Sequence, residues 1–217
     1  MQMGANRRGK IIYRKLLILV VLCSQAVFAE EDSYLIDDSL AMARQGEFVR
    51  AADLIMDLAD DGNAKAQYVL SMYFRDPNEL NIPELGEKLL FQAAENNNAK
   101  AQYDLGWRLA AGWKNDSVED MVEMIYWFER ATFNGSDDAY GNLATLYENE
   151  HRDVLAEMEV AANNGNAMAQ FNLGWINARG LMSSEGLMQD MDVAKTWFEK
   201  SAKLGFKDAI EVLEKNF

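Results

Sequence analysis

A short phrase of small and aromatic residues recurs along the chain and restricts what the chain can fold into. It reads Ala-Gln-Tyr-x-Leu at residues 66–70 and 101–105 and Ala-Gln-Phe-x-Leu at 169–173. A weaker copy occupies residues 139–143, and a fifth, worn copy begins at Ala209. Successive copies therefore start 30 to 40 residues apart. This period is typical of stacked helical hairpins, each of which cannot bury its apolar face alone.

Each repeat is expected to hold two helices. The first carries the phrase, whose small residues let neighbouring helices approach closely, and the second carries a large apolar pair such as Trp127-Phe128 or Trp197-Phe198. Glycine or asparagine just past the second helix supplies a left-handed turn. We therefore predict an all-α solenoid of about five helical hairpins followed by a capping helix. The hairpins are expected at about residues 33–62, 64–97, 99–135, 137–165 and 167–205, and the cap at 207–217.

The first 29 residues have the pattern of an export signal rather than of a repeat. Five basic residues between Arg7 and Lys15 precede a mostly apolar run from Leu16 to Ala29. We predict a signal peptide at residues 1–29, cleaved after Ala29, and a single solenoid domain at 30–217. The apolar run is too short to cross ~30 Å of hydrocarbon, so we expect no stable membrane insertion once the leader is removed. A retained anchor is the alternative.

The charge of the chain limits its partners. Five of the 21 basic residues lie in the predicted leader, which leaves 16 against 35 acidic residues and a net charge of −19. So acidic a surface repels nucleic acid and anionic lipid headgroups, and we expect neither to bind. It favours a basic protein partner. Solubility alone is the other explanation of the charge.

The residues that usually carry chemistry are scarce. The single cysteine, Cys23, lies in the predicted leader, so the exported chain would hold no disulfide. The single histidine, His151, stands in a polar stretch and fits a solvated turn better than a catalytic triad or a zinc site. We therefore predict no catalytic residue, no cofactor and no metal site.

The phrases at 101–106 and 169–174, with Trp-Phe-Glu-Lys-Ser-Ala at 197–202, resemble the Sel-1-like repeat family, a relative of the tetratricopeptide repeats. The resemblance covers roughly residues 61–206 and implies a right-handed superhelix. Secreted bacterial members of this family act as adaptors. The resemblance therefore implies a non-catalytic, exported, protein-binding adaptor in the periplasm or outside the cell, and as a sharper hypothesis an immunity-type protein that neutralises a periplasmic toxin.

Two alternatives follow from the same resemblance. One is a structural or regulatory part of an envelope machine, such as a flagellar motor or a polysaccharide exporter. The other is the cysteine-rich branch of the family, which is associated with hydrolysis of β-lactams. In that branch disulfides link the helices of each repeat, so the lack of cysteine after Ala29 argues against β-lactam hydrolysis by this chain.

Three surfaces are candidates for partner binding. In related tetratricopeptide arrays the residue after the Leu-Gly pair points into the concave groove, which selects Met72, Trp107 and Trp175, with Arg108 and Arg179 at the edges. An apolar loop and an acidic rim are the other two. The loop holds Leu181, Met182, Leu187 and Met188, and the rim holds Asp137, Asp138, Glu148, Glu150 and Asp153. The competing interpretations are core packing for the tryptophans, packing onto the fourth hairpin for the loop, and plain solvation for the acids. The aromatic residues of the phrase (Tyr68, Tyr103, Phe171) and Trp127 and Trp197 are expected to pack inside the stack.

The enzyme alternative has a direct test. We expect the purified protein to leave nitrocefin, a chromogenic β-lactam, unhydrolysed, because the chain lacks the cysteines of the hydrolysing branch and a nucleophile–base motif. Absorbance of the opened ring after prolonged incubation is the measurement. Turnover above a heat-denatured control would contradict the non-catalytic interpretation.

Overall fold

The computed structural model describes residues 29–77, 79–112, 117–148, 154–180 and 189–217. All secondary-structure elements within these residue ranges are helices, and no strand occurs there. The chain divides into two compact units, one up to Gly86 and one from Glu87 onward. None of the helices in these ranges is long and apolar enough to cross a membrane.

The first unit contains a helical segment at residues 29–43, helix α2 (Phe48–Asp60), helix α3 (Ala64–Arg75) and the start of α4 (Pro83–Glu95), within which the division falls. Its core includes Ile36, Ile55 and Leu70, all nearly inaccessible to solvent. A buried serine links the elements, since the Ser39 hydroxyl lies 2.8 Å from the Ala51 carbonyl oxygen and 3.2 Å from the Tyr73 hydroxyl.

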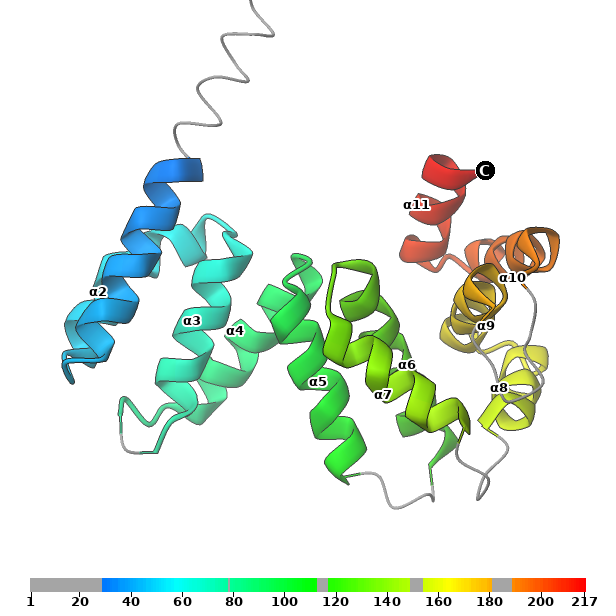
Figure 1. Cartoon of the computed structure of the whole chain (residues 1–217), viewed down its shortest axis with the longest axis horizontal. Helices are drawn as coiled ribbons and strands as arrows, with labels where there is room; N and C mark the ends of the chain where they lie inside the picture. Colours follow the sequence, from blue (N-terminus) through cyan, green and yellow to red (C-terminus); the bar gives the residue numbers. More distant parts are fainter. Residues whose placement is uncertain (1–28, 78, 113–116, 149–153, 181–188) are drawn as a thin grey trace, which may run out of the picture. The chain divides into compact units, whose positions relative to one another are not determined.

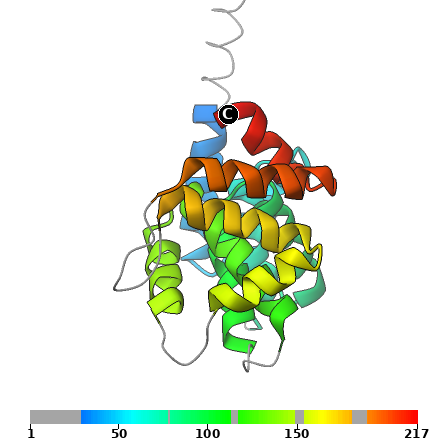
Figure 2. The same ribbon diagram turned by 90° about the vertical axis from the view of Figure 1, so that its right-hand side faces the viewer.

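The second unit contains the rest of α4 and seven further helices in the described ranges (Figure 1). These helices are α5 (Ala99–Gly112), α6 (Val118–Phe133), α7 (Asp137–Glu148), α8 (Val154–Asn163), α9 (Ala167–Arg179), α10 (Met191–Lys203) and α11 (Lys207–Asn216). Helix α5 packs on α6, α9 packs on α10, and α11 packs on α10. Figure 2 shows α8, α9, α10 and α11 stacked in layers. The predicted all-α solenoid of helical hairpins is confirmed, and the hand of its superhelix stays a prediction.

The predicted turn residues stand where expected. Gly62, Asn97, Gly135, Gly165 and Gly205 each have a positive φ, between 66° and 92°, just beyond a second helix. Most residues with a side chain rarely adopt this conformation, whereas glycine adopts it without strain and asparagine tolerates it, so these two residue types are favoured there.

A hydrogen bond that the sequence analysis missed joins successive hairpins. The buried glutamine of the phrase donates from Nε2 to a carbonyl oxygen in the last turn of the preceding second helix. The pairs are Gln67 with Ala59, Gln102 with Ala94 and Gln170 with Ala162, at 2.9, 2.8 and 2.8 Å. Each of these carbonyl oxygens also accepts the backbone N–H of the turn residue, as Ala94 does from Asn97 at 3.1 Å. The glutamine therefore adds a second hydrogen bond at the same oxygen, satisfies its own buried amide, and ties the next helix to the end of the preceding one.

The glycine of the phrase makes room for an aromatic ring. A Cβ atom built on Gly106 would lie 2.7 Å from Cδ1 of Phe128, and one built on Gly174 would overlap the Phe198 ring. The two rings are buried. The Leu-Gly pair of the first helix and the Trp-Phe pair of the second are therefore complementary halves of one packing contact.

The fourth pair of helices departs from this pattern. Its first helix, α7, carries Tyr140 at the glutamine position, and this side chain is exposed. Helices α7 and α8 make little contact with each other, both contact α6, and α6 also packs directly on α9. A single apolar core runs through this arrangement and includes Ile125, Leu143, Met158 and Leu173.

These contacts predict opposite effects for two glycine substitutions. Gly106→Ala should destabilise the fold by about 1–3 kcal/mol, because the new methyl group meets the buried Phe128 ring. Gly141→Ala, in α7, should stabilise it by about 0.5–1 kcal/mol, because nothing lies within 4 Å of the new atom and alanine is the better helix former. Thermal or urea unfolding followed by circular dichroism measures both. Equal effects of the two substitutions would contradict the packing described here.

Candidate functional site

The residues predicted to line a groove fall into three different environments. Trp107 is 54 % exposed on α5, and its neighbour Arg108 forms an ion pair with Glu87. Met72 is half-buried on α3, in the first unit. Trp175 and Arg179 are half-buried on α9. The structure therefore leaves Trp107 open to solvent and places Trp175 among other aromatic rings.

Trp175 belongs to an aromatic cluster at the junction of α6, α9 and α10. Its ring centre lies 5.2 Å from that of Phe133, 6.3 Å from that of Phe171 and 5.5 Å from that of Phe198. The guanidinium of Arg179 covers its ring at 4.9 Å. Of the residues expected to pack, Phe171 and Trp127 are buried, and Trp197 is half-buried against the core.

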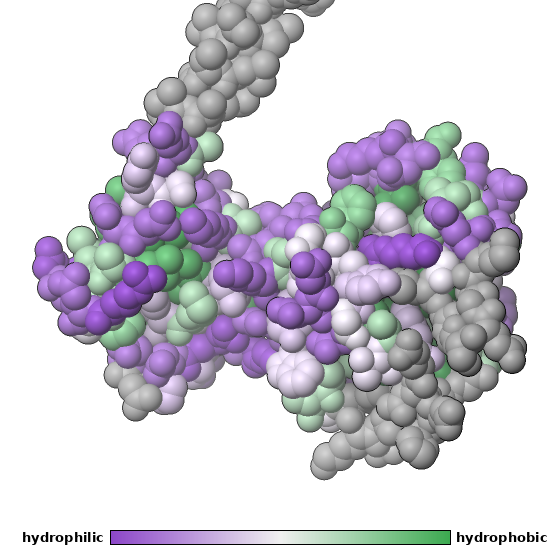
Figure 3. Space-filling model, in the orientation of Figure 1, coloured by the Kyte–Doolittle hydropathy of each residue, from purple (hydrophilic) through white to green (hydrophobic). Residues whose placement is uncertain are grey.

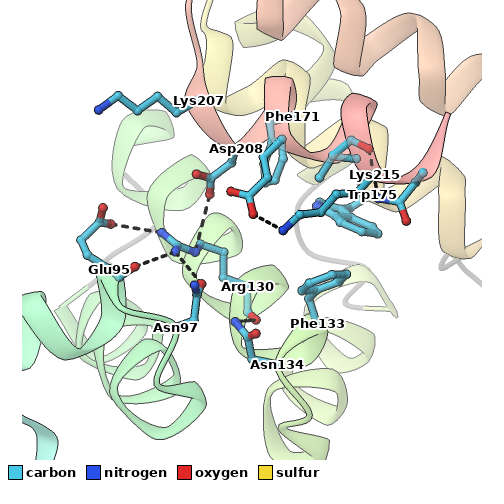
Figure 4. Close-up of a pocket in the computed structure, with 13 residues that line it drawn as sticks. Glu95, Asn97, Arg130, Phe133, Asn134, Phe171, Trp175, Lys207, Asp208 and Lys215 are labelled. Atoms are coloured by element: carbon cyan, nitrogen blue, oxygen red, sulfur yellow. Dashed lines mark hydrogen bonds and ion pairs between the residues drawn. The ribbon is translucent and has the colours of Figure 1, made fainter. Parts of the chain in front are cut away.

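A cavity of about 230 Å³ opens onto this cluster, and we call it the aromatic cavity (Figure 4). One wall is aromatic and comes from α6 and α9. The other wall comes from α11 and from the turn after α4, and it is polar. The principal lining residues are Glu95, Asn97, Arg130, Phe133, Phe171, Trp175, Asp208, Glu211, Val212 and Lys215.

Arg130 holds the polar wall together. Its Nη1 donates to the Glu95 carboxylate at 3.1 Å and to the Tyr126 hydroxyl at 2.8 Å. Its Nη2 donates to the Asn97 side chain at 3.0 Å, and its Nε lies 3.6 Å from the Asp208 carboxylate. Burial raises the pKa of the Tyr126 hydroxyl, so this group stays protonated and donates to Asp208 at 3.0 Å. The guanidinium thus links α4, α6 and α11.

Phe133 is the unusual residue of the aromatic wall. It is 60 % exposed although it contacts Trp175. The matching positions in the other second helices, counted from the turn residue that follows each, hold Glu95, Asn163 and Lys203. An exposed phenylalanine at a position that is otherwise polar could have been noticed from an alignment of the repeats. The role of Arg130 could not, since its partners Glu95 and Asp208 lie far apart in the sequence.

A second polar contact lies between α6 and α9. Glu129 is 0 % exposed and forms an ion pair with Arg179, whose side chain is 18 % exposed. The equivalent Glu199, in the same phrase of the last hairpin, is exposed. Glu129 is buried because α9 packs directly on α6, and Asn172 of α9 donates to the Val122 carbonyl oxygen of α6 at 2.9 Å in the same seam.

Burial dominates the electrostatics of Glu129. It raises the pKa of this carboxyl from 4.5 to about 7, although the positive charge of Arg179 acts in the opposite direction. Among the described residues, its Oε1 atom and the buried hydroxyl of Tyr147 make no hydrogen bond of ordinary geometry. The two groups nevertheless face each other, and this contact with the hydroxyl acts to lower the pKa of Glu129. The pKa of the Tyr147 hydroxyl is also raised, chiefly by burial and in second place by the negative charge of Glu129.

The remaining candidate surfaces are described only in part. Asp137 and Asp138 are exposed in the first turn of α7, where the positive end of the helix dipole stabilises them. Glu150 and Asp153, the side chain of Glu148, and the loop residues Leu181, Met182, Leu187 and Met188 lie outside the described part of the chain, as does His151. On the face drawn in Figure 3, hydrophilic residues predominate in both units. Among the described residues no group of three or more histidine, cysteine or acidic side chains could hold a metal ion.

Solved structures similar to this chain include two repeat proteins. No protein-family model and no curated protein matches the sequence. A Sel1 repeat protein from Oxalobacter formigenes is 23 % identical over 85 % of this chain and 78 % of that chain, with a TM-score of 0.46. A protective antigen of uropathogenic Escherichia coli strains, which displays an SLR fold, is 26 % identical over 75 % of this chain and 35 % of that chain, with a TM-score of 0.39. With scores this low we draw no functional argument from either; the repeat fold is established by the helical hairpins described above.

The buried carboxyl predicts an unusual pH dependence of stability. Because the pKa of Glu129 is higher in the folded protein than its ordinary value, the folded state binds this proton more tightly than the unfolded chain. Its contribution is present below about pH 4.5 and is lost as the pH rises through about 7, a change of about 3 kcal/mol. Glu129→Gln should flatten the fall in stability over this interval, and the exposed control Glu199→Gln should not. Unfolding midpoints across the pH range measure both. A slope as steep in Glu129→Gln as in the control would show that Glu129 is ionised throughout.

Proposed function

We propose that this array of Sel1-like repeats is a non-catalytic, exported adaptor that binds another protein. The observation that carries the proposal is Trp107, which is 54 % exposed on a first helix beside an exposed arginine. Tryptophan and arginine dominate the binding energy of protein interfaces, and the exposed part of this indole offers apolar surface that a partner could cover.

The surroundings of Arg108 support the same conclusion. A cavity of about 310 Å³ lies against α4, α5 and α6, and Phe91, Leu105 and Leu109 give it apolar surface. Phe91 is itself exposed and contacts the buried Trp127 edge-on, with 5.8 Å between ring centres. An exposed aromatic residue, Phe91, thus lines a cavity together with the Arg108–Glu87 pair, a combination of apolar centre and polar rim that is usual in interfaces.

The sharper form of the proposal is an immunity-type protein that neutralises a toxin in the periplasm. It is supported by the predicted leader and by the net charge of −14, which becomes −19 without that leader. Strong negative charge speeds encounter with a basic partner and disfavours acidic ones. The periplasmic location, the basic character of the partner and the immunity role are all parts of this proposal.

Co-expression tests the sharper form. A toxic protein encoded beside the gene for this chain, directed to the periplasm, should lose its toxicity when this protein is present. Unchanged toxicity would contradict the immunity role, and a complex recovered instead from envelope extracts with a motor or exporter component would favour the alternative.

A substitution tests the surface. Trp107→Ala should weaken the complex with that neighbouring gene product by about tenfold or more, because an exposed interface tryptophan loses most of its contact area, while the fold is retained. The matched control is Val193→Ala, an exposed apolar side chain on α10 that should change the affinity little. Titration calorimetry measures both dissociation constants. Equal affinities of the two variants would place the interface elsewhere.

A further inference from the structure

The aromatic cavity has a composition that packing of the stack does not explain. Phe133 occupies a position where the other second helices carry Glu95, Asn163 and Lys203, and 60 % of its surface is open to water. If this position only faced solvent at the end of a helix, we would expect a polar side chain there, as in the other second helices. Phenylalanine instead extends the buried aromatic cluster outward, from Phe171 through Trp175 to the surface.

The opposite wall is polar, so the cavity has two chemically different sides. Helix α11 directs Asp208, Glu211 and Lys215 toward the cavity, and buries only Ala209 completely. In Figure 4 the side chain of Lys207 extends away from Phe133 and Trp175. An occupant must therefore be apolar on one side and charged or polar on the other.

The sign of the charge follows from the ion pairs. Lys215 and Glu211 neutralise each other. Arg130 faces two carboxylates, those of Glu95 and Asp208, so that group of three carries one net negative charge. Lys207 also lines the cavity, so the lining as a whole is formally neutral and the negative excess is confined to this group. Both Nη atoms of its guanidinium donate hydrogen bonds and Nε lies 3.6 Å from the Asp208 carboxylate, so Arg130 is already engaged by acidic and polar groups. The Glu95 side chain is 50 % exposed and has room for a further cation.

From these observations we infer that the aromatic cavity docks a segment of a basic protein partner, one apolar side chain lying beside Phe133 and Trp175 and a lysine or arginine beside Glu95 and Asp208. This inference deepens the proposed protein-binding function and rests on it. The charge of the whole chain, −14, favours the same partner. The cavity of about 230 Å³ is large enough for one apolar side chain but small for a drug-sized ligand.

The probe is a library of random short peptides displayed on phage, selected on the full chain at low salt. Enriched peptides should carry a large apolar residue next to lysine or arginine, and a synthetic copy should bind more weakly as the salt concentration rises. Phe133→Asn, which copies the residue at the matching position of α8, should reduce the affinity of that peptide about tenfold or more. Glu95→Gln should reduce it less and should lessen the salt dependence.

Val160→Asn is the control, since Val160 is also an exposed apolar residue of a second helix but does not line this cavity. Circular dichroism checks that each variant is folded. Peptides that bind Phe133→Asn as well as they bind the unchanged protein would overturn the inference, as would acidic consensus peptides or no enrichment at all. Concentration-dependent dimers abolished by Phe133→Asn would assign the cavity to a second copy of the chain, and retention of the protein by anionic vesicles through Phe133 would assign it to a membrane; either result overturns the inference.

The outcomes separate this inference from the proposed function. A partner complex that survives Phe133→Asn but is lost in Trp107→Ala leaves the adaptor proposal intact and rejects the aromatic cavity as the docking site. If the complex is lost in both variants, the partner spans both surfaces of the second unit and the inference stands. If no protein partner is found and peptides still bind the cavity in the expected manner, the adaptor proposal fails while the cavity remains a peptide site.

Discussion

One hydrogen bond, repeated along the chain, determines how the hairpins stack. The buried glutamine of the phrase donates to a last-turn carbonyl oxygen of the preceding hairpin, as Gln102 does to Ala94 and Gln170 does to Ala162. A glutamine that failed to reach that oxygen would leave its own buried amide unsatisfied, although the carbonyl would keep the backbone N–H of the turn residue, so the contact favours one placement of the next helix. The glycine–phenylalanine contact, as at Gly106 and Phe128, then closes the hairpin itself.

Where the glutamine is missing, the stack rearranges. Helix α7 begins with Ala139 and the exposed Tyr140, makes little contact with α8, and leaves α6 free to contact α9 directly. This contact buries Glu129 with Arg179, and places Asn172 against a backbone carbonyl of α6. Buried polar groups of this kind add little net stability, but they penalise other registers, because a shifted α9 would leave the Glu129 charge without its partner.

The same rearrangement creates the aromatic cavity. Bringing α9 onto α6 sets Trp175 beside Phe133, and α11 then lies close enough for Asp208 to reach Arg130 and Tyr126. The aromatic cavity thus depends on the repeat that departs most from the pattern. Trp107 lies on one of the regular repeats and needs no such rearrangement. The surface around Trp107 and the aromatic cavity therefore arise from different features of the second unit.

The amino-acid sequence alone was sufficient for the architecture. Spacing of the phrases, the turn residues from Gly62 to Gly205 and the aromatic pairs of the second helices predicted the helices, because each of these signals acts within one or two helical turns. It selected Trp107 and Trp175 alike as groove residues, with core packing as the alternative for both, whereas the structure leaves Trp107 exposed and packs Trp175 among aromatic rings. Only the tertiary structure decided that Glu129 is buried while Glu199 is exposed, that Arg130 links three helices, and that Phe133 faces a cavity. Those outcomes depend on contacts between residues 33 to 82 positions apart, and a repeat pattern carries no information about which distant helix fills the space left by an irregular neighbour.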